Sequence, residues 1–239
     1  MLNRSTKYYA VIAAFTFGTA LASTASMAAL LSASVGGVPV GAGVYENFDG
    51  LAATGGLSAH GITVSFSGPG AGTATLPDAP GQYAAPFISG SNGTPFGDAQ
   101  ANGPDVTQYL TTGIGQVTLQ LAGYNQYFGV LWGSVDDYNT LSFYNGTTLL
   151  FNFTGLNVDG MANGNQGAAG TFYVNINSDT PFNKVIASST GYAFEFDNVA
   201  LAVNPIRLPE TGVVPEPGTL ALLGLGLLAG IATRHRRTK

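Results

Sequence analysis

Short stretches that alternate apolar and polar residues fill the middle of this sequence, and they constrain the fold more than any other feature. Residues 62–67 and 117–121 alternate along their whole length, which is the period-two pattern of a strand with one buried face. Further strands are expected at 127–132, 140–144, 148–153, 171–176, 184–188 and 192–203. Clusters of Gly, Asn, Pro, Asp and Ser, as at 163–167, separate these segments and favour turns. Because residues 30–214 show no helical period, the sequence predicts an all-β domain, and a β-sandwich rather than a parallel sheet.

The clearest local prediction is a β-hairpin centred on Asn145-Gly146. This dipeptide favours a type I′ turn, because both central residues of that turn need a positive φ. The turn would place Tyr144 beside Thr147. The run that follows, 148–153, has apolar residues on both of its faces, so we expect it to be a central strand.

Residues 29–204 are long enough to form one domain around a single hydrophobic core. The chain has no cysteine, which excludes disulfides, thiol nucleophiles and thiolate-bound metals. Between residues 29 and 214, Lys184 and Arg207 stand against twelve acidic residues. This balance excludes a nucleic-acid-binding surface, because phosphate binding requires clustered lysine or arginine.

The first 28 residues have the organisation of a signal peptide. Arg4 and Lys7 precede the apolar stretch 8–21, and Ser26 and Ala28 are the small residues at positions three and one before a cut. We expect cleavage after Ala28 and export through the inner membrane. The alternative is an N-terminal membrane anchor.

Residues 215–239 form a tail with three parts: a Pro-Glu-Pro triplet, an uncharged span at 218–233 and a basic end. A helix of this span rises about 24 Å, slightly less than the hydrocarbon layer of about 30 Å. We therefore expect a transmembrane helix at 218–233, with the basic end on the cytoplasmic side. The triplet is Pro215, Glu216 and Pro217, and the membrane-stop cations are Arg234, Arg236 and Arg237.

The sequence V-P-E-P-G-T-L-A-L-L-G-L-G-L-L-A-G from Val214, followed by R-H-R-R, resembles the PEP-CTERM sorting domain of Gram-negative bacteria. The resemblance implies recognition by a membrane exosortase, anchoring in the inner membrane before processing, cleavage near 215–217, and a final place at the cell surface or outside the cell. A second pattern, L-P-E-T-G at 208–212, matches the L-P-x-T-G motif of sortase substrates. The alternative interpretation of that pattern is a Pro-rich linker at 205–214.

Two further blocks carry a resemblance. W-G-S-V-D-D-Y-N-T-L-S-F-Y begins at Trp132, and F-E-F-D-N occupies 194–198. Together they resemble a family of exosortase-dependent surface proteins. The resemblance implies a jelly-roll-like or galactose-binding-like β-sandwich of unassigned activity.

No enzyme activity is expected from the residues that catalysis usually requires. A Ser-His-Asp triad needs a histidine base, and His60, the one histidine outside the tail, lies in a G-L-S-A-H context that is not a nucleophile elbow. Zinc would require several His or Cys ligands. A glycosidase stays open as an alternative, because it needs only two suitably separated carboxylates.

Calcium is the cofactor that these residues favour, and a chain without any cofactor is the other expectation. Asp136, Asp137 and Asp197, with Asn139 and Asn198, offer hard oxygen ligands at the edges of strand-like runs. The alternative is that these side chains cap turns by bonding to their own backbone.

Trp132 and Tyr138 are the candidate sugar platform, since the apolar face of a sugar stacks on aromatic rings beside polar groups. The alternative is that Trp132 fills the core. We expect an exported surface or matrix protein with a structural or adhesive role in the envelope or its exopolysaccharide. A carbohydrate-binding module and a secreted glycosidase are the alternatives.

Overall fold

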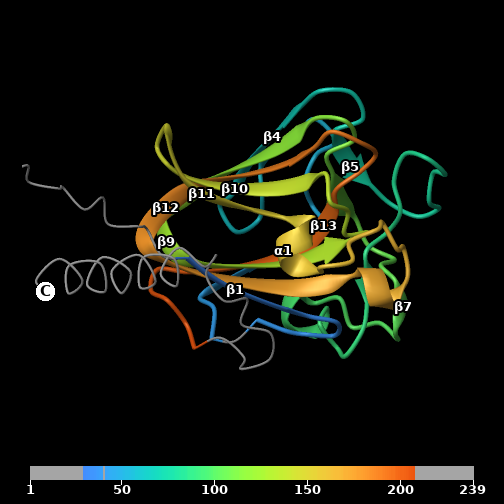
Figure 1. Ribbon diagram of the computed structural model, residues 1–239, viewed down its shortest axis with the longest axis horizontal. Helices are drawn as coiled ribbons and strands as arrows, with labels where there is room; N and C mark the ends of the chain where they lie inside the picture. Colours follow the sequence, from blue (N-terminus) through green and yellow to red (C-terminus); the bar gives the residue numbers. More distant parts are fainter. Residues whose placement is uncertain (1–28, 40, 208–239) are drawn as a thin grey trace, which may run out of the picture.

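The computed structural model describes residues 29–39 and 41–207, and these are almost entirely β-strands and loops (Figure 1). The signal peptide 1–28, most of the linker 205–214 and the tail 215–239 with its expected span lie outside the described residues. In the part that is described, no helix is both long and apolar enough to cross a membrane. The all-β expectation is confirmed. The jelly-roll-like or galactose-binding-like type stays a prediction.

Eleven strands form one sheet, and two more form a separate pair. The strands are β1 Ala29–Ser34, β2 Val44–Glu46, β3 Gly56–Leu57, β4 Thr63–Ser67, β5 Gly72–Ala74, β6 Phe87–Ile88, β7 Gly103–Pro104, β8 Tyr109–Thr111, β9 Gln116–Gly133, β10 Asn139–Asn145, β11 Thr148–Thr154, β12 Phe172–Ser189 and β13 Glu195–Ala202. The helical segments are short: η1 Thr94–Phe96, α1 Gly155–Val158 and η2 Ala168–Gly170. The sheet order is β11-β10-β12-β9-β13-β8-β5, with β1 beside β12, β2 beside β13, and β4 joining β3 to β9, while β6 pairs with β7.

The two longest strands, β9 and β12, take part in both layers of the folded sheet. The first half of β9 pairs with β4 and with the second half of β12, whereas its second half pairs with β13 and with the first half of β12. The register of β12 against β9 shifts between Asn177 and Phe182, and Figure 1 shows β12 turning there from one layer into the other. The sequence pattern predicted two separate strands within each, because the alternation is interrupted at the bend.

Aromatic side chains fill the space between the layers. Trp132 is fully buried and stacks on Phe194, with 4.1 Å between the ring centroids. Phe143 lies at the centre of a second group, whose ring centroids are 4.7 to 5.5 Å away and belong to Phe128, Phe151 and Phe182. Such pairs add about 0.5–1.5 kcal/mol each to the free energy gained by burial.

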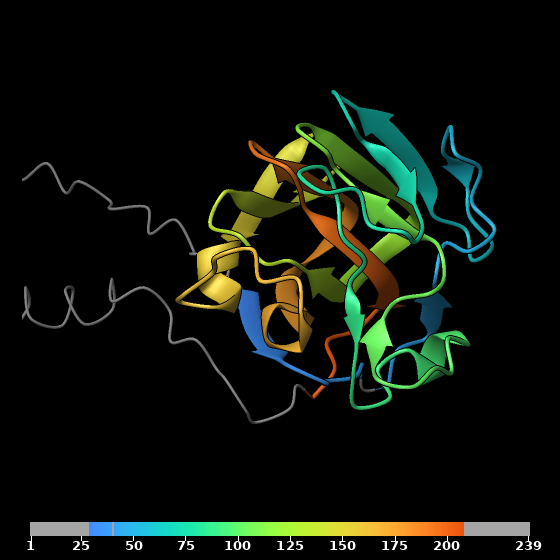
Figure 2. The same cartoon turned by 90° about the vertical axis from the view of Figure 1, so that its right-hand side faces the viewer.

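The second half of β9 is buried on both faces. Its even-numbered residues face the main core, while Tyr127 and Leu131 face a smaller cluster with Ile88, Phe96 and Tyr173. Chain segments between β5 and β8 supply part of this cover. In Figure 2, β13, coloured orange-red, passes through the middle of the molecule.

The predicted hairpin is present, but its register and its place in the sheet differ from the prediction. Its loop is Gly146-Thr147, and Asn145 pairs with Thr148. Gly146 has a φ of 58° whereas Thr147 has no positive φ, which is typical of a type II′ turn rather than type I′. The prediction of a central strand is wrong, because β11 is the edge strand of the sheet and Leu149 is 48% exposed.

Candidate functional site

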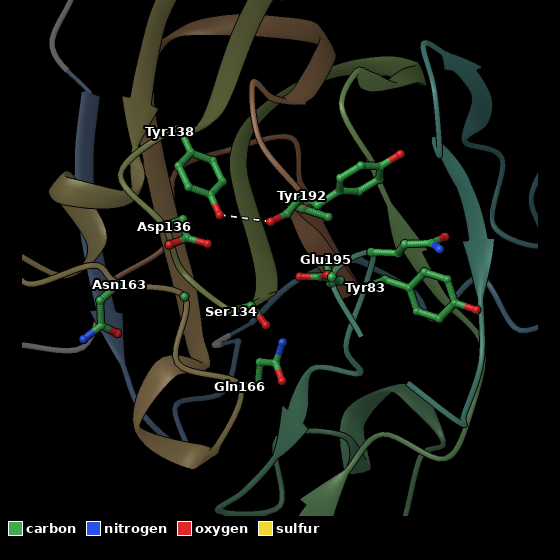
Figure 3. Close-up of a pocket in the computed structure, with 12 residues that line it drawn as sticks. Tyr83, Ser134, Asp136, Tyr138, Asn163, Gln166, Tyr192 and Glu195 are labelled. Carbon is green, nitrogen blue, oxygen red and sulfur yellow. Dashed lines mark hydrogen bonds between the residues drawn. The ribbon is translucent and has the colours of Figure 1, made fainter. Parts of the chain in front are cut away.

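Four loops meet at one end of the two-layered sheet and enclose a polar pocket of about 180 Å³ (Figure 3). They are the segment 81–83 before β6, the turn 134–138 between β9 and β10, the segment 163–166 before η2, and the turn at 192–193 between β12 and β13. Glu195, the first residue of β13, completes the lining.

The floor of this pocket consists of Glu195 and Ser134, both buried. Glu195 Oε1 accepts the N–H of Ala84 at 3.0 Å, and Oε2 has no hydrogen-bond partner among the described residues. Ser134 Oγ lies close enough to this carboxyl to lower its pKa, but it forms no full hydrogen bond with any described residue. Burial raises the pKa of Glu195 to about 8. A buried polar group without a partner costs about 1–3 kcal/mol, so both groups are suited to bind a polar ligand.

The wall of the pocket is formed by Asp136 and Tyr138. Tyr138 donates its hydroxyl to the carbonyl of Tyr192 at 3.0 Å. Burial, and more weakly the charge of Asp137, raise the pKa of Asp136 above its usual range. Figure 3 shows the carboxyl groups of Asp136 and Glu195 pointing toward the same space.

The rim carries further neutral polar groups, namely Tyr83, Tyr192, Gln82, Asn163 and Gln166. Among the described residues that line the pocket, none is basic. An anionic ligand is therefore disfavoured, and an uncharged ligand with many hydroxyl groups is favoured.

The two residues of the predicted sugar platform have different positions. Trp132 is buried against Phe194, with no exposed surface for a ligand. The prediction that Trp132 stacks on sugar is wrong, because the even-numbered residues in this half of β9 point into the main core. Tyr138 does line the pocket.

The three predicted calcium ligands are not brought together. Asp136 lies in the pocket wall and Asp137 is exposed. Asp197 is fully buried beside Asp98 and Asp105 instead. The predicted grouping is wrong, because Asp136 and Asp137 lie in the turn between β9 and β10, whereas Asp197 lies within β13 and is buried in the interior. The sorting residues Pro215, Glu216, Pro217, Arg234, Arg236 and Arg237 lie outside the described residues.

Sequence reasoning missed Ser134 and Glu195 as site residues, although both belong to the two conspicuous blocks that begin at Trp132 and Phe194. Ser134, Asp136 and Tyr138 occupy every second position, a signal that could have indicated one shared surface. The rim residues come from loops with no periodic pattern, so nothing in the sequence marks them.

Comparison with family models matches residues 213–237 to the PEP-CTERM protein-sorting motif. The match falls on the tail that resembles this motif by its Pro-Glu-Pro triplet. The chain matches no curated protein and no solved structure.

Proposed function

We propose that this chain, an exported surface protein that an exosortase sorts through its PEP-CTERM motif, binds carbohydrate in the pocket of Figure 3. Its role is then adhesive, within the envelope or the surrounding exopolysaccharide. The motif supports a membrane-anchored precursor that is later placed at the cell surface or outside the cell. The observation that carries the binding part is the floor of two buried polar groups, Glu195 Oε2 and Ser134 Oγ, that find no hydrogen-bond partner in residues 29–39 and 41–207.

The size and lining of the pocket support a single sugar residue as its occupant. A volume of about 180 Å³ lies below the roughly 300–1,000 Å³ of sites for drug-sized ligands. Tyr83, Tyr138 and Tyr192 offer apolar ring faces, and the amides of the rim offer donors and acceptors for hydroxyl groups. A hydroxyl can both donate and accept, so it can satisfy the carboxyl and the Ser134 hydroxyl together.

A site of this size binds weakly when it acts alone. Many copies on one surface facing a repetitive polysaccharide raise the effective concentration of each further contact, so overall avidity exceeds the affinity of one site by roughly 10²–10⁴. This arithmetic supports an adhesive role rather than the capture of free sugars.

A glycan array, followed by calorimetry with the bound glycans and with the organism's own exopolysaccharide, tests the proposal. Gln166→Ala and Ser134→Ala are each expected to weaken binding by up to about tenfold, since one hydrogen bond contributes about 0.5–1.5 kcal/mol and about 1.4 kcal/mol corresponds to a tenfold change in Kd. Tyr124→Ala is the matched control, because Tyr124 is exposed and lies outside the pocket. Equal binding by all four proteins, or no bound glycan at all, refutes the proposal.

A secreted glycosidase is the second candidate, because the carboxyl groups of Asp136 and Glu195 line one pocket. Hydrolysis with two carboxyl groups releases new reducing ends. If wild type releases reducing sugar from the exopolysaccharide and Glu195→Gln does not, the chain is a glycosidase rather than an adhesin. Without such release the binding function stands.

A further inference from the structure

Three carboxylates gather in the interior near the start of β13. Asp98 follows η1, Asp105 follows β7, and Asp197 lies within β13. Their exposed fractions are 5%, 0% and 0%, and each offers an oxygen that lies within 4.8 Å of the others. Three separate segments of the chain thus place their carboxyl groups in one buried cluster.

The described part of the chain gives these carboxylates no cation. None of the three forms an ion pair there, and Lys184 lies instead over the ring of Tyr144, 4.6 Å from its centroid. Burial raises the pKa of Asp98 to about 6 and that of Asp197 well above its usual range, and the negative charge of Asp105 adds to both shifts. Buried charge without a partner is strongly destabilising.

Each carboxylate leaves oxygen atoms unused. Asp98 Oδ1 accepts from Asn47 at 3.3 Å, and Asp105 Oδ1 accepts from the N–H and hydroxyl of Thr107 at 2.9 and 2.7 Å. Asp98 Oδ2, Asp105 Oδ2 and both oxygens of Asp197 have no hydrogen-bond partner among the described residues. Four buried oxygens are therefore available to a cation.

A neutral side chain at the same place points independently to a ligand. Asn198 is fully buried, and neither its Oδ1 nor its Nδ2 has a hydrogen-bond partner among the described residues. Its amide faces Asp98. The residue has a φ of 55° and lies where the register of β13 against β9 shifts. An unpaired buried amide oxygen beside three carboxylates completes an all-oxygen set of ligands.

We propose that Asp98, Asp105, Asp197 and the amide oxygen of Asn198 bind one calcium ion, which fastens the segment 94–105 to β13. Hard oxygen ligands exclude the metals that prefer nitrogen or sulfur. Calcium accepts six to eight oxygens in flexible geometry, whereas magnesium demands a near-ideal octahedron and retains waters. Such an ion removes the repulsion among the three carboxylates. The site is separate from the saccharide pocket, and the proposal does not depend on that pocket.

The test begins with the full chain, melted in EGTA, in excess calcium chloride and in the same concentration of magnesium chloride. At a hundredfold excess over Kd, calcium is expected to raise the melting temperature by about 5–10 °C, with one ion per chain by calorimetry. Magnesium is expected to produce a smaller rise. Equal melting temperatures in EGTA and calcium overturn the site, and equal rises with the two ions overturn its assignment to calcium.

Asp197→Asn separates a metal ligand from a merely structural residue, with Asp137→Asn as the control on an exposed acid. The amide has the shape of the carboxylate but no charge. The variant is therefore expected to melt above wild type in EGTA, because repulsion is relieved, and to lose the rise with calcium. Asp105→Asn repeats the test if Asp197→Asn does not fold. A variant that keeps the calcium rise, or that is destabilised equally in both conditions, overturns the proposal.

Discussion

Replacing Glu46 by alanine is expected to be strongly destabilising, because this carboxylate holds together the chain around β2 and the loop before β4. Glu46 is 1% exposed. Its oxygens accept the hydroxyl of Ser58 at 2.5 Å, the N–H of Phe48 at 2.9 Å and the N–H of His60 at 2.8 Å. His60, the histidine considered for catalysis, contributes its backbone here while its side chain is 56% exposed, with Nδ1 3.5 Å from the carboxylate.

The magnitude follows from the groups that the substitution leaves behind. Glu46→Ala removes the acceptor from the buried Ser58 hydroxyl and from the N–H of Phe48, and each unpaired buried group costs about 1–3 kcal/mol. The N–H of His60 lies nearer the surface and regains water. We therefore expect the free energy of unfolding to fall by about 3–5 kcal/mol, which lowers the melting temperature by on the order of 10 °C in a domain of this size.

Urea unfolding of the full chain, followed by circular dichroism, measures this loss. Asp137→Ala is the matched control, since Asp137 is exposed and surface changes usually stay within about 0.5 kcal/mol. Glu46→Gln keeps one acceptor oxygen and should fall between the two. If Glu46→Ala unfolds at the same urea concentration as the control, the three hydrogen bonds do not stabilise this region.

Further expectations address the core, the hairpin, alkaline stability and processing. Trp132→Ala should lower the free energy of unfolding, measured in urea, by about 3–5 kcal/mol, while glycan affinity on the array should not change. Loss of glycan affinity in a folded variant would show that Trp132 takes part in binding. Gly146→Ala should cost about 1 kcal/mol in urea, since the φ of 58° strains any L-residue while the space around it is open, and a neutral effect would contradict the turn. Burial raises the pKa of Tyr127, so the folded chain keeps the hydroxyl proton while the unfolded chain loses it above pH about 10. The free energy of unfolding then falls by up to about 1.4 kcal/mol per pH unit. Urea unfolding from pH 9 to 11 should show a smaller decrease of this free energy with pH in Tyr127→Phe than in wild type. Mass spectrometry of the exported protein should find its C-terminus near residues 215–217, and an intact Lys239 would contradict exosortase cleavage.

The sequence alone located β4 and the strands from β9 onward, though not β1 to β3 or β5 to β8, and it identified the sorting tail. The alternation at 62–67 and 117–121 reappears in β4 and β9, because side chains of a strand point to opposite faces and one face here must be buried. The tail was recognisable because its triplet, apolar span and basic end are contiguous. Each of these features is local, so no knowledge of distant neighbours was needed.

Strand order required the tertiary structure. Apolar residues on both faces of 148–153 suggested a central strand, but hydrogen bonding with partners elsewhere places β11 at the edge. The continuity of β9 and β12 through their bends likewise depends on pairing between the two strands. A sequence pattern predicts which residues of a strand are buried, but it does not predict which other strand pairs with it.

The sites depended most on the tertiary structure. Glu195 meets Ser134 and Gln166 only because four loops converge, and Asp197 meets Asp98 and Asp105 across about half of the domain. The sequence determined that this chain is a β-protein with a sorting tail, because periodicity and motifs are short-range properties. Only the tertiary structure decided which side chains share a pocket or a buried charge cluster, because loops have no period and contacts between distant residues are set by the packing of the whole sheet.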